Sequence, residues 1–204
     1  AHASASSFGL YFDASSLVLP NDVIILAGLH PFYLPKMRTL IDLKIFIDPD
    51  IKLQLHWKII RDMDQRGHSL EKILNQINQR KDDRAQHIDP QKDFADIIVS
   101  YFTNDLFEIG NPKSNPLVNV KIILDSSITL DPLLKSLLKE NIKVEWDYAH
   151  DLHHQYIILH KQLSADLVAR IAQNTLINIE EITGDIVIWQ DGNRGFVQLI
   201  TLMI

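Results

Sequence analysis

A short apolar run, VIILA at residues 23–27, constrains the fold more than any other feature of this chain. An uninterrupted run of this kind is typical of a strand buried on both faces, as in a parallel sheet covered by helices. The run ends abruptly in Gly-Leu-His-Pro, and a buried strand places side chains near a ligand at such an ending. We therefore expect an α/β protein with a binding site at the end of strand 23–27.

Strand and helix patterns alternate along the first half of the chain. Apolar side chains recur every four positions from Ile51, which predicts an amphipathic helix, and Gly67 is its natural stop. Ser69 is a typical helix N-cap, so a second helix is expected to follow. In chain order we expect a strand at 43–47, helices at 51–66 and 69–83, a loop opened by Pro90 and a strand at 95–102.

The segment NPKSNP, residues 111–116, holds two prolines and no large apolar side chain, which predicts a hinge between two domains. An α/β half would cover residues 1–104. A smaller α+β domain, with a dimerising or regulatory role, would cover 112–204. In that domain we expect antiparallel strands at 143–149 and 155–160, other strands at 118–124, 177–182 and 185–189, helices at 131–141 and 164–176, and a closing apolar segment at 196–204.

The composition excludes several classes of function. A net charge of −6 and a pI near 5.8 give no electrostatic footprint for nucleic acid. No apolar run approaches the roughly 20 residues that span a bilayer, so no membrane partner is expected. The chain has no cysteine, which excludes disulfides and thiol chemistry and fits a reducing compartment, so we expect a cytoplasmic protein.

The densest polar cluster lies in KIIRDMDQRGHS, residues 58–69. One interpretation is a solvated helix face with two ion pairs, each worth roughly 0.2–0.5 kcal/mol. The other is a lid over a polyphosphate, because two arginines beside one acid leave positive charge and guanidinium groups fit phosphate oxygens. The side chains that share one half of the helix circumference are Lys58, Arg61, Asp62 and Arg66.

Three histidines and Asp151 lie within HDLHH, residues 150–154, and could supply metal ligands. On a strand, however, His150 and His154 would share one face and His153 would lie on the other, which spoils a simple three-ligand site. Loop or edge-strand histidines are therefore the favoured interpretation, and we predict no metal site.

Large apolar side chains in the second half each allow two interpretations. The closing segment 196–204 must be buried either within the chain or against a second copy in a homodimer. Four aromatic residues are expected to pack in the core rather than to form a binding surface: Trp146, Tyr148, Tyr156 and Trp189.

Several motifs in a fixed order resemble the phosphoribulokinase/uridine kinase family. In chain order they are VIILAGLHPFY, LIDLKIFIDPD, LHWKIIRDMDQRGHSLEKI and INQRKDDRAQHIDPQKDFADIIV, and they span about residues 17–102. The resemblance is best to the phosphoribulokinases of oxygenic phototrophs, which read E-G-L-H-P-x-Y, then W-K-x-x-R-D-M-x-x-R-G-H-S, then I-D-P-Q-K. The motifs are long, ordered and specific, which argues against a chance match.

The resemblance implies a P-loop kinase fold, in which a parallel sheet is flanked by helices and a helical lid covers the nucleotide. It implies transfer of a phosphoryl group from ATP, with Mg²⁺, to a hydroxyl of a sugar phosphate or nucleoside. Less definite roles are implied for Lys92 and Asp96. By matching positions we expect phosphate or nucleotide binding by the lid residues Arg61, Arg66, His68 and Arg80, and substrate binding by Lys58 and His30.

Two departures from the family pattern affect the expected chemistry. The chain has seven glycines and none is followed by lysine, so its residues hold no G-x-x-x-x-G-K-[ST] loop to bind the β- and γ-phosphates. The acid of the E-G-L-H motif is Ala27 here, and a methyl group cannot coordinate Mg²⁺. No catalytic residue is therefore assigned, and neither ATP nor Mg²⁺ is expected to bind this chain alone.

Two hypotheses follow for the function. In the first, the chain is a fragment or a degenerate member of the kinase family and is inactive alone. The lack of an initiator Met favours a fragment, whereas Ala27 favours degeneracy. In the second, it is a non-catalytic binding or regulatory protein on a decayed kinase scaffold. Under both hypotheses we expect a phosphate-bearing small-molecule ligand and a homo-oligomer.

Overall fold

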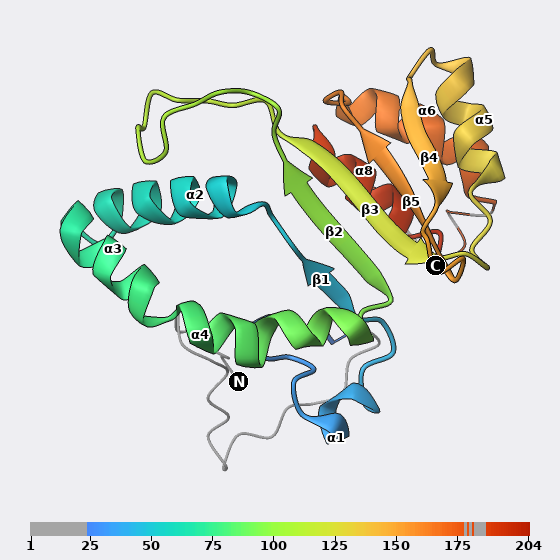
Figure 1. The fold of residues 1–204 in the computed structure, drawn as a ribbon. Helices are drawn as coiled ribbons and strands as arrows, with labels where there is room; N and C mark the ends of the chain where they lie inside the picture. The colour runs from blue at the N-terminus through green and yellow to red at the C-terminus, as the bar shows by residue number, and fades with distance from the viewer. Residues whose placement is uncertain (1–23, 178, 180, 182–186) are drawn as a thin grey trace.

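The computed structural model describes residues 24–177, 179, 181 and 187–204. One five-stranded sheet runs through both halves of the chain in the order β1-β2-β3-β5-β4 (Figure 1). β1 (Ile45–Ile47) pairs in parallel with β2 (Ile97–Phe102). The antiparallel part of the sheet consists of β3 (Asn119–Asp125), β5 (His154–Leu159) and β4 (Val144–Tyr148).

The α/β class is confirmed, and the sheet is mixed. β1 and β2 are parallel because residues 48–96 between them are long enough, and helical enough, to cross over from one strand to the next. Residues 103–118, all of them described, contain no helix, and the chain reverses there so that β2 and β3 pair antiparallel. The parallel arrangement that we expected is therefore limited, among the described strands, to one pair.

The crossover from β1 to β2 forms an arch of helices beside the sheet (Figure 1). The helices expected at 51–66 and after Ser69 are confirmed. The loop expected at Pro90 is wrong, because Pro90 lies in the first turn of a 3-10 helix, where its missing N–H is not needed. After a short α1 (Pro35–Arg38), the arch comprises α2 (Ile51–Asp64), α3 (Leu70–Gln79), α4 (Lys81–Asp83), a π-helical turn at Arg84–Ile88 and the 3-10 helix at Asp89–Phe94.

Local signals set the ends of α2 and α3. The carboxylate of Asp50 caps α2 by accepting a hydrogen bond from the Leu53 amide at 2.8 Å. The hydroxyl of Ser69 caps α3 by accepting one from the Lys72 amide at 3.3 Å. Between the two helices Gly67 adopts φ +62°, a conformation that glycine reaches without a steric penalty. The chain therefore turns sharply just beyond α2.

The strand expected at 23–27 is wrong within the described residues. Residues 24–27 are irregular, Ile24 and Ile25 are 68% and 86% exposed, and Val23 lies outside the described residues. A strand forms when its backbone groups pair with a neighbouring strand. Among the described strands, β1 pairs only with β2, so the apolar run has no strand beside it to complete.

The main core lies between the sheet and three helices of the second half. α5 (Asp131–Lys139), α6 (Ala165–Thr175) and α8 (Asn193–Thr201) lie together on one side of β3, β5 and β4 (Figure 1). Alternate residues of β3 and β5 are buried, as expected for strands with one covered face. Fully buried members of this core include Ile122, Leu124, Ile157, Leu137, Ile171 and Phe196.

The closing apolar segment is buried inside the chain. It forms most of α8, in which Phe196, Leu199 and Ile200 are buried. The antiparallel strands expected at 143–149 and 155–160 are confirmed as β4 and β5. The strands expected at 177–182 and 185–189 fall partly outside the described residues, at 178, 180, 182, 185 and 186. Of their described residues, 179 and 181 are helical and 187–189 are irregular.

The expected burial of the aromatic residues holds only in part. Trp189 packs against the core, and Tyr156 is half-buried on β5. Trp146 and Tyr148 are 39% and 48% exposed, because β4 is the last strand of the described sheet. The Trp146 indole N–H donates to Oε1 of Gln155 at 2.9 Å, so its polar group is satisfied.

The two halves of the chain share one sheet, and β2 of the first half contributes to the main core. β2 and β3 are paired along their length, and Ile97 and Val99 are buried with Val120. The loop that contains 111–116 contacts α2, where the Gly110 amide donates to Nδ1 of His56 at 3.0 Å. The division into domains at 1–104 and 112–204 stays a prediction. No helix in the described part of the chain has the length and apolar character needed to cross a bilayer.

Candidate functional site: a cationic cluster on one buried carboxylate

A buried carboxylate brings the expected lid residues of α2 together. Asp62 has no exposed side-chain surface. Its Oδ1 lies 2.9 Å from Nη2 of Arg61 and 3.2 Å from Nη1 of Arg66. Its Oδ2 accepts a hydrogen bond from Nζ of Lys58 at 2.9 Å. Three of the expected binding residues therefore meet on one carboxylate, which the sequence analysis placed in the cluster without giving it a binding role.

This Asp62 cluster, made of Lys58, Arg61, Asp62 and Arg66, has an excess of positive charge. Three cations against one carboxylate leave a formal net charge of +2. The side chains of Arg61, Arg66 and Lys58 remain 48%, 36% and 29% exposed. An anion can therefore reach free guanidinium N–H groups while Asp62 keeps its partners. Both ion pairs of the solvated-face interpretation are present, and it differs from the structure in that the Asp62 side chain is buried.

The electrostatics of the cluster keep Asp62 ionised. Burial raises the pKa of the Asp62 carboxyl, but hydrogen bonds from Lys58 and Arg61, together with their positive charges, outweigh burial. The pKa of Asp62 consequently lies below its ordinary value. At neutral pH the carboxylate is a permanent anion that orients the surrounding cations.

The turn after α2 holds His68 at the same corner. Its amide donates to the carbonyl of Asp62 at 3.1 Å, and the Gly67 amide donates to the carbonyl of Met63 at 3.2 Å. Among the described residues, Nδ1 of His68 is buried and has no hydrogen-bond partner. His68 therefore joins the Asp62 cluster through the backbone, and one ring nitrogen is left for another interaction.

Arg80 and His30 belong to other segments than the Asp62 cluster. Arg80 is exposed at the junction of α3 and α4, where its amide donates to the carbonyl of Ile77 at 3.2 Å. His30 is exposed in the loop before α1, and its ring meets the edge of Tyr33 at a centroid distance of 5.9 Å. The structure thus gathers Lys58, Arg61, Arg66 and His68 at one corner, while His30 lies on the loop before α1 and Arg80 at the end of α3.

A second ionic network fastens the end of the arch to β1. Asp48, just after β1, pairs with Lys92 and lies 3.6 Å from Nη2 of Arg84. Arg84 also donates to Oδ1 of Asp89 at 2.9 Å and to the side-chain amide of Gln54. Two cations face two carboxylates, so this network is formally neutral and has no excess charge for an anion. It joins the end of the arch to β1. The sequence signals for it were the resemblance, which implied a less definite role for Lys92, and the turn signal Asp48-Pro49-Asp50.

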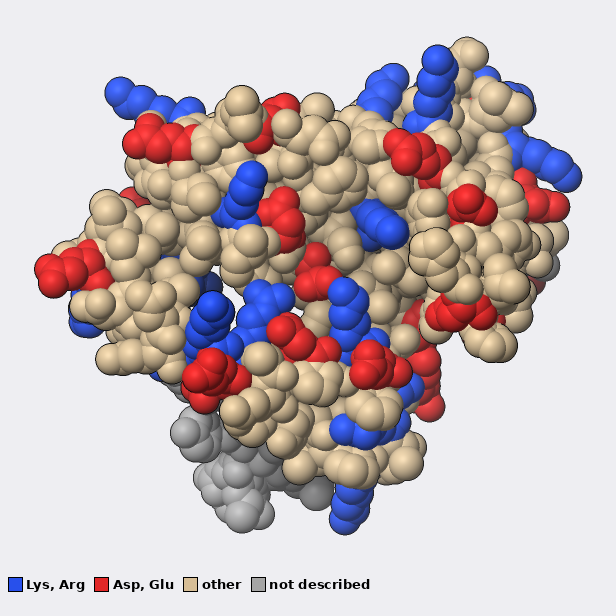
Figure 2. Space-filling model, viewed as in Figure 1, with Lys and Arg blue, Asp and Glu red and all other residues tan. Residues whose placement is uncertain are grey.

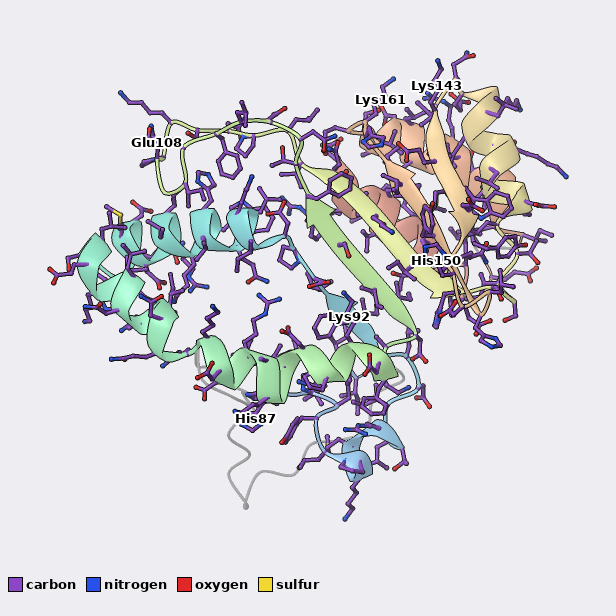
Figure 3. All side chains as sticks on the ribbon, in the orientation of Figure 1. His87, Lys92, Glu108, Lys143, His150 and Lys161 are labelled. Carbon is purple, nitrogen blue, oxygen red and sulfur yellow. The ribbon has the colours of Figure 1, made fainter. Side chains whose placement is uncertain are left out.

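The figures show how these charges lie around the arch. In Figure 2, Lys and Arg side chains gather, with some Asp and Glu, around a hollow between α2 and the segment 81–94. In Figure 3, Lys92 lies on the side of that segment that faces β1, and His87 lies on the opposite side. The segment therefore presents one charged face to the hollow and another face to the loop that carries His30.

Comparison with known proteins decides the family. The model of the phosphoribulokinase / uridine kinase family matches residues 3–107, half of the chain. The chain belongs to this family. The match includes α2, α3 and the return to β2, so the Asp62 cluster and the Asp48 network both lie within the family segment.

Individual relatives agree with this assignment. The phosphoribulokinase of Synechocystis is 34% identical over 135 residues, which cover 66% of this chain and 39% of that protein. The chloroplastic enzyme of Triticum aestivum is 35% identical over 66% of this chain and 32% of its own length. A uridine kinase of Clostridium botulinum is 36% identical over 40% of each chain. The chain thus spans about a third of the curated phosphoribulokinases that it matches.

One solved structure is also similar. Phosphoribulokinase from Rhodobacter spheroides superposes with a TM-score of 0.46 and 24% identity, over 60% of this chain and 43% of that one.

The family consists of ATP-dependent kinases, for which ATP and Mg²⁺ are the expected cofactors. The Asp62 cluster fits phosphate oxygens, since it offers guanidinium and ammonium donors with excess positive charge. The described residues fit Mg²⁺ poorly. The side chain of Ala27 is a methyl group without oxygen, and no group of three His, Asp or Glu side chains in the described ranges is placed to hold a metal ion.

Asp151 of the HDLHH segment, residues 150–154, contacts His153 and His154. Asp151 accepts a hydrogen bond from the amide of His153 at 3.0 Å, and its other oxygen lies 2.6 Å from Nδ1 of His154. The pKa of Asp151 is lowered chiefly by its hydrogen bond with His154. Residues 150–153 form a turn and His154 begins β5, so these contacts close the turn that joins β4 to β5.

Proposed function

We propose that this chain provides the phosphate-binding lid of a phosphoribulokinase/uridine kinase-family phosphotransferase, and that it has no kinase turnover by itself. The observation that carries the proposal is the Asp62 cluster, in which three partly exposed cations share one buried carboxylate. The excess charge of the cluster matches a phosphate group, which carries between one and two negative charges at neutral pH.

The residues of the cluster would divide the work. Arg61 and Arg66 would donate to phosphate oxygens and neutralise charge that develops on a transferred phosphoryl group. Lys58 would lie near the acceptor, and the partly exposed His68 would contribute phosphate binding at the turn between α2 and α3. His30 and Arg80 would contribute from the acceptor loop and the far end of α3.

Phosphoryl transfer by the intact family member requires groups beyond those in this sequence. The 204 residues contain no Gly-Lys pair, and Ala27 stands where the family has an acid. A parent with a phosphate-binding loop would transfer the γ-phosphate of ATP to a sugar-phosphate or nucleoside hydroxyl. The second candidate is a non-catalytic binding or regulatory protein, which Ala27 favours because truncation does not alter an interior residue.

Isothermal titration with inorganic pyrophosphate tests the binding site. We expect Arg61→Ala and Arg66→Ala each to weaken binding by about 1–3 kcal/mol, since each removes a charge-assisted hydrogen bond. Arg170→Ala is the matched control, because Arg170 is a 55% exposed arginine that pairs with Glu140 far from the cluster. Equal effects of all three variants on pyrophosphate binding would show that the Asp62 cluster is an ordinary charged surface and not a phosphate site.

A coupled assay with ATP, Mg²⁺ and ribulose 5-phosphate or uridine tests the absence of turnover. We expect no product above background from the purified chain, and measurable product would end the non-catalytic part of the proposal. Self-association and a cytoplasmic location belong to the same proposal. The first is supported by the exposed aromatic side chains on the edge strand β4 and is measured by analytical ultracentrifugation.

A further inference from the structure

A single buried amide joins the His30 loop, residues 29–33, to the end of the arch. Gln91 is 1% exposed in the 3-10 helix. Its Nε2 donates to the carbonyl of Leu29 and to the carbonyl of His87, each at 2.9 Å. Its Oε1 accepts from the amide of Phe32 at 3.2 Å. Both donors and the acceptor of this side chain are therefore in use, two of them on a loop about sixty residues away.

Other contacts of the loop reach the same segment. The Tyr33 hydroxyl lies 3.1 Å from Nδ1 of His87. Arg38 donates to the carbonyls of Phe32 and Tyr33 at 2.8 and 2.7 Å, and its guanidinium lies 3.5 Å from the centroid of the Phe94 ring. Residues 29–38 are thus attached to 87–94, and Gln91 is the buried member of the attachment.

The position of His30 depends on this attachment. His30 is exposed, and its recorded ring contact is with Tyr33, which itself contacts His87. The strand that would otherwise hold the loop is not formed at 24–27, where the backbone is irregular. The loop therefore takes its place from the arch rather than from the sheet.

We infer that Gln91 is a positioning residue that fixes the His30 loop to the segment closing the helical arch, so that loop and segment move as one body. The opposite face of this segment carries Lys92, which pairs with Asp48 at the end of β1 (Figure 3). The segment is thereby held on both faces. Gln91 would then keep the His30 loop, on the acceptor side of the site, in a fixed position relative to the lid. This role rests on the function proposed above.

A side chain that only fills space would behave differently from a hydrogen-bonding clamp. Gln91→Met keeps nearly the same volume and removes all three hydrogen bonds. Gln91→Glu keeps an acceptor for the Phe32 amide but has no donor for the two carbonyls. Gln86→Met is the matched control, because Gln86 is exposed on the π-helical turn of the same segment.

Amide hydrogen exchange, followed by NMR on the whole chain, reads the clamp directly. We expect the Phe32 amide to exchange roughly tenfold faster or more in Gln91→Met and in Gln91→Glu, while amides of β3 and β5 keep their protection. Gln86→Met should match the unaltered protein. An unchanged Phe32 amide in Gln91→Met would show that Gln91 only fills space, and an unchanged amide in Gln91→Glu would show that the two donors are not needed. Either result overturns the inference.

Titration with ribose 5-phosphate and with inorganic phosphate tests the functional part. We expect Gln91→Met to weaken ribose 5-phosphate about fivefold or more and to leave inorganic phosphate within about twofold, because the Asp62 cluster is intact. Equal weakening of both ligands would overturn a specific effect on the loop. If the unaltered chain binds neither ligand, the proposed function fails together with the functional role of Gln91, and the exchange data still decide the clamp.

Discussion

Nη1 of Arg66 lies 3.2 Å from Oδ1 of Asp62, although α2 ends at Asp64 and Arg66 lies beyond it. The Asp62 carboxylate therefore holds a cation that lies beyond the last residue of α2. The backbone carbonyl of Asp62 also accepts a hydrogen bond from the His68 amide. Backbone and side chain of one residue therefore organise the corner at which α3 begins, and the phosphate-binding proposal depends on this corner.

Replacing Asp62 by Asn should destabilise the protein by about 1–3 kcal/mol, since three cations lose their shared anion while shape is kept. The cost stays below that of isolating a fully buried charge, because the cations retain access to solvent. Urea unfolding measures the change. Asp64→Asn, at an exposed position of the same helix, is the control and should lie within about 0.5 kcal/mol of the unaltered protein.

Stability should fall on acidification below about pH 4, and Asp62 should account for part of that fall. The folded-state pKa of Asp62 lies below its unfolded value, which is about 3.9. Its stabilising contribution is therefore fully present above the unfolded pKa and is lost as the pH falls through the folded pKa. Between pH 6 and pH 3 the free energy of unfolding should fall less steeply with decreasing pH in Asp62→Asn than in the unaltered protein. Parallel curves for the two proteins would contradict this assignment.

Gly67→Ala should cost about 1–2 kcal/mol, because φ +62° places a Cβ against its own backbone. A Cβ at Gly67 meets no other atom within 4 Å, so the cost comes from backbone conformation alone. Gly28→Ala provides the comparison, since Gly28 also has open space and has no positive φ. Thermal unfolding of the two variants should separate them clearly. A stable Gly67→Ala protein would mean that the turn can relax.

Asp48→Asn should loosen the end of the arch without changing phosphate affinity. It weakens the pair with Lys92 and the contact with Arg84, which hold the segment 84–94 beside β1. Limited proteolysis should therefore cut within 80–94 faster than in the unaltered chain, while pyrophosphate binding stays within about twofold. Loss of pyrophosphate binding in this variant would show that the Asp48 network belongs to the ligand site.

Much of the fold could be predicted because its signals are local. Asp50, Ser69 and Gly67 set the ends of α2 and α3 through contacts within a few residues. The strand expected at 155–160 likewise forms, as β5. The candidate site was predicted in part for the same reason, since Lys58 on α2 and Arg66 just beyond it each lie four residues from Asp62.

Long-range contacts could not be predicted in this way. Nothing near Gln91 in the sequence indicates that its amide binds residues 29 and 32. Nor does the spacing of Asp48 and Lys92 indicate an ion pair across 44 positions. The strand expected at 23–27 failed for a related reason, because an apolar run specifies a need for burial but not the neighbour that satisfies it.

The sequence by itself determined the family, the helices α2 and α3 and the cations spaced around Asp62, because each depends on residue identity and short-range spacing. The tertiary structure alone decided that Asp62 is buried, that the sheet is continuous and mixed, and that the His30 loop is attached to the arch rather than to a strand. Burial and long-range pairing arise when distant segments meet, and no local pattern encodes that meeting.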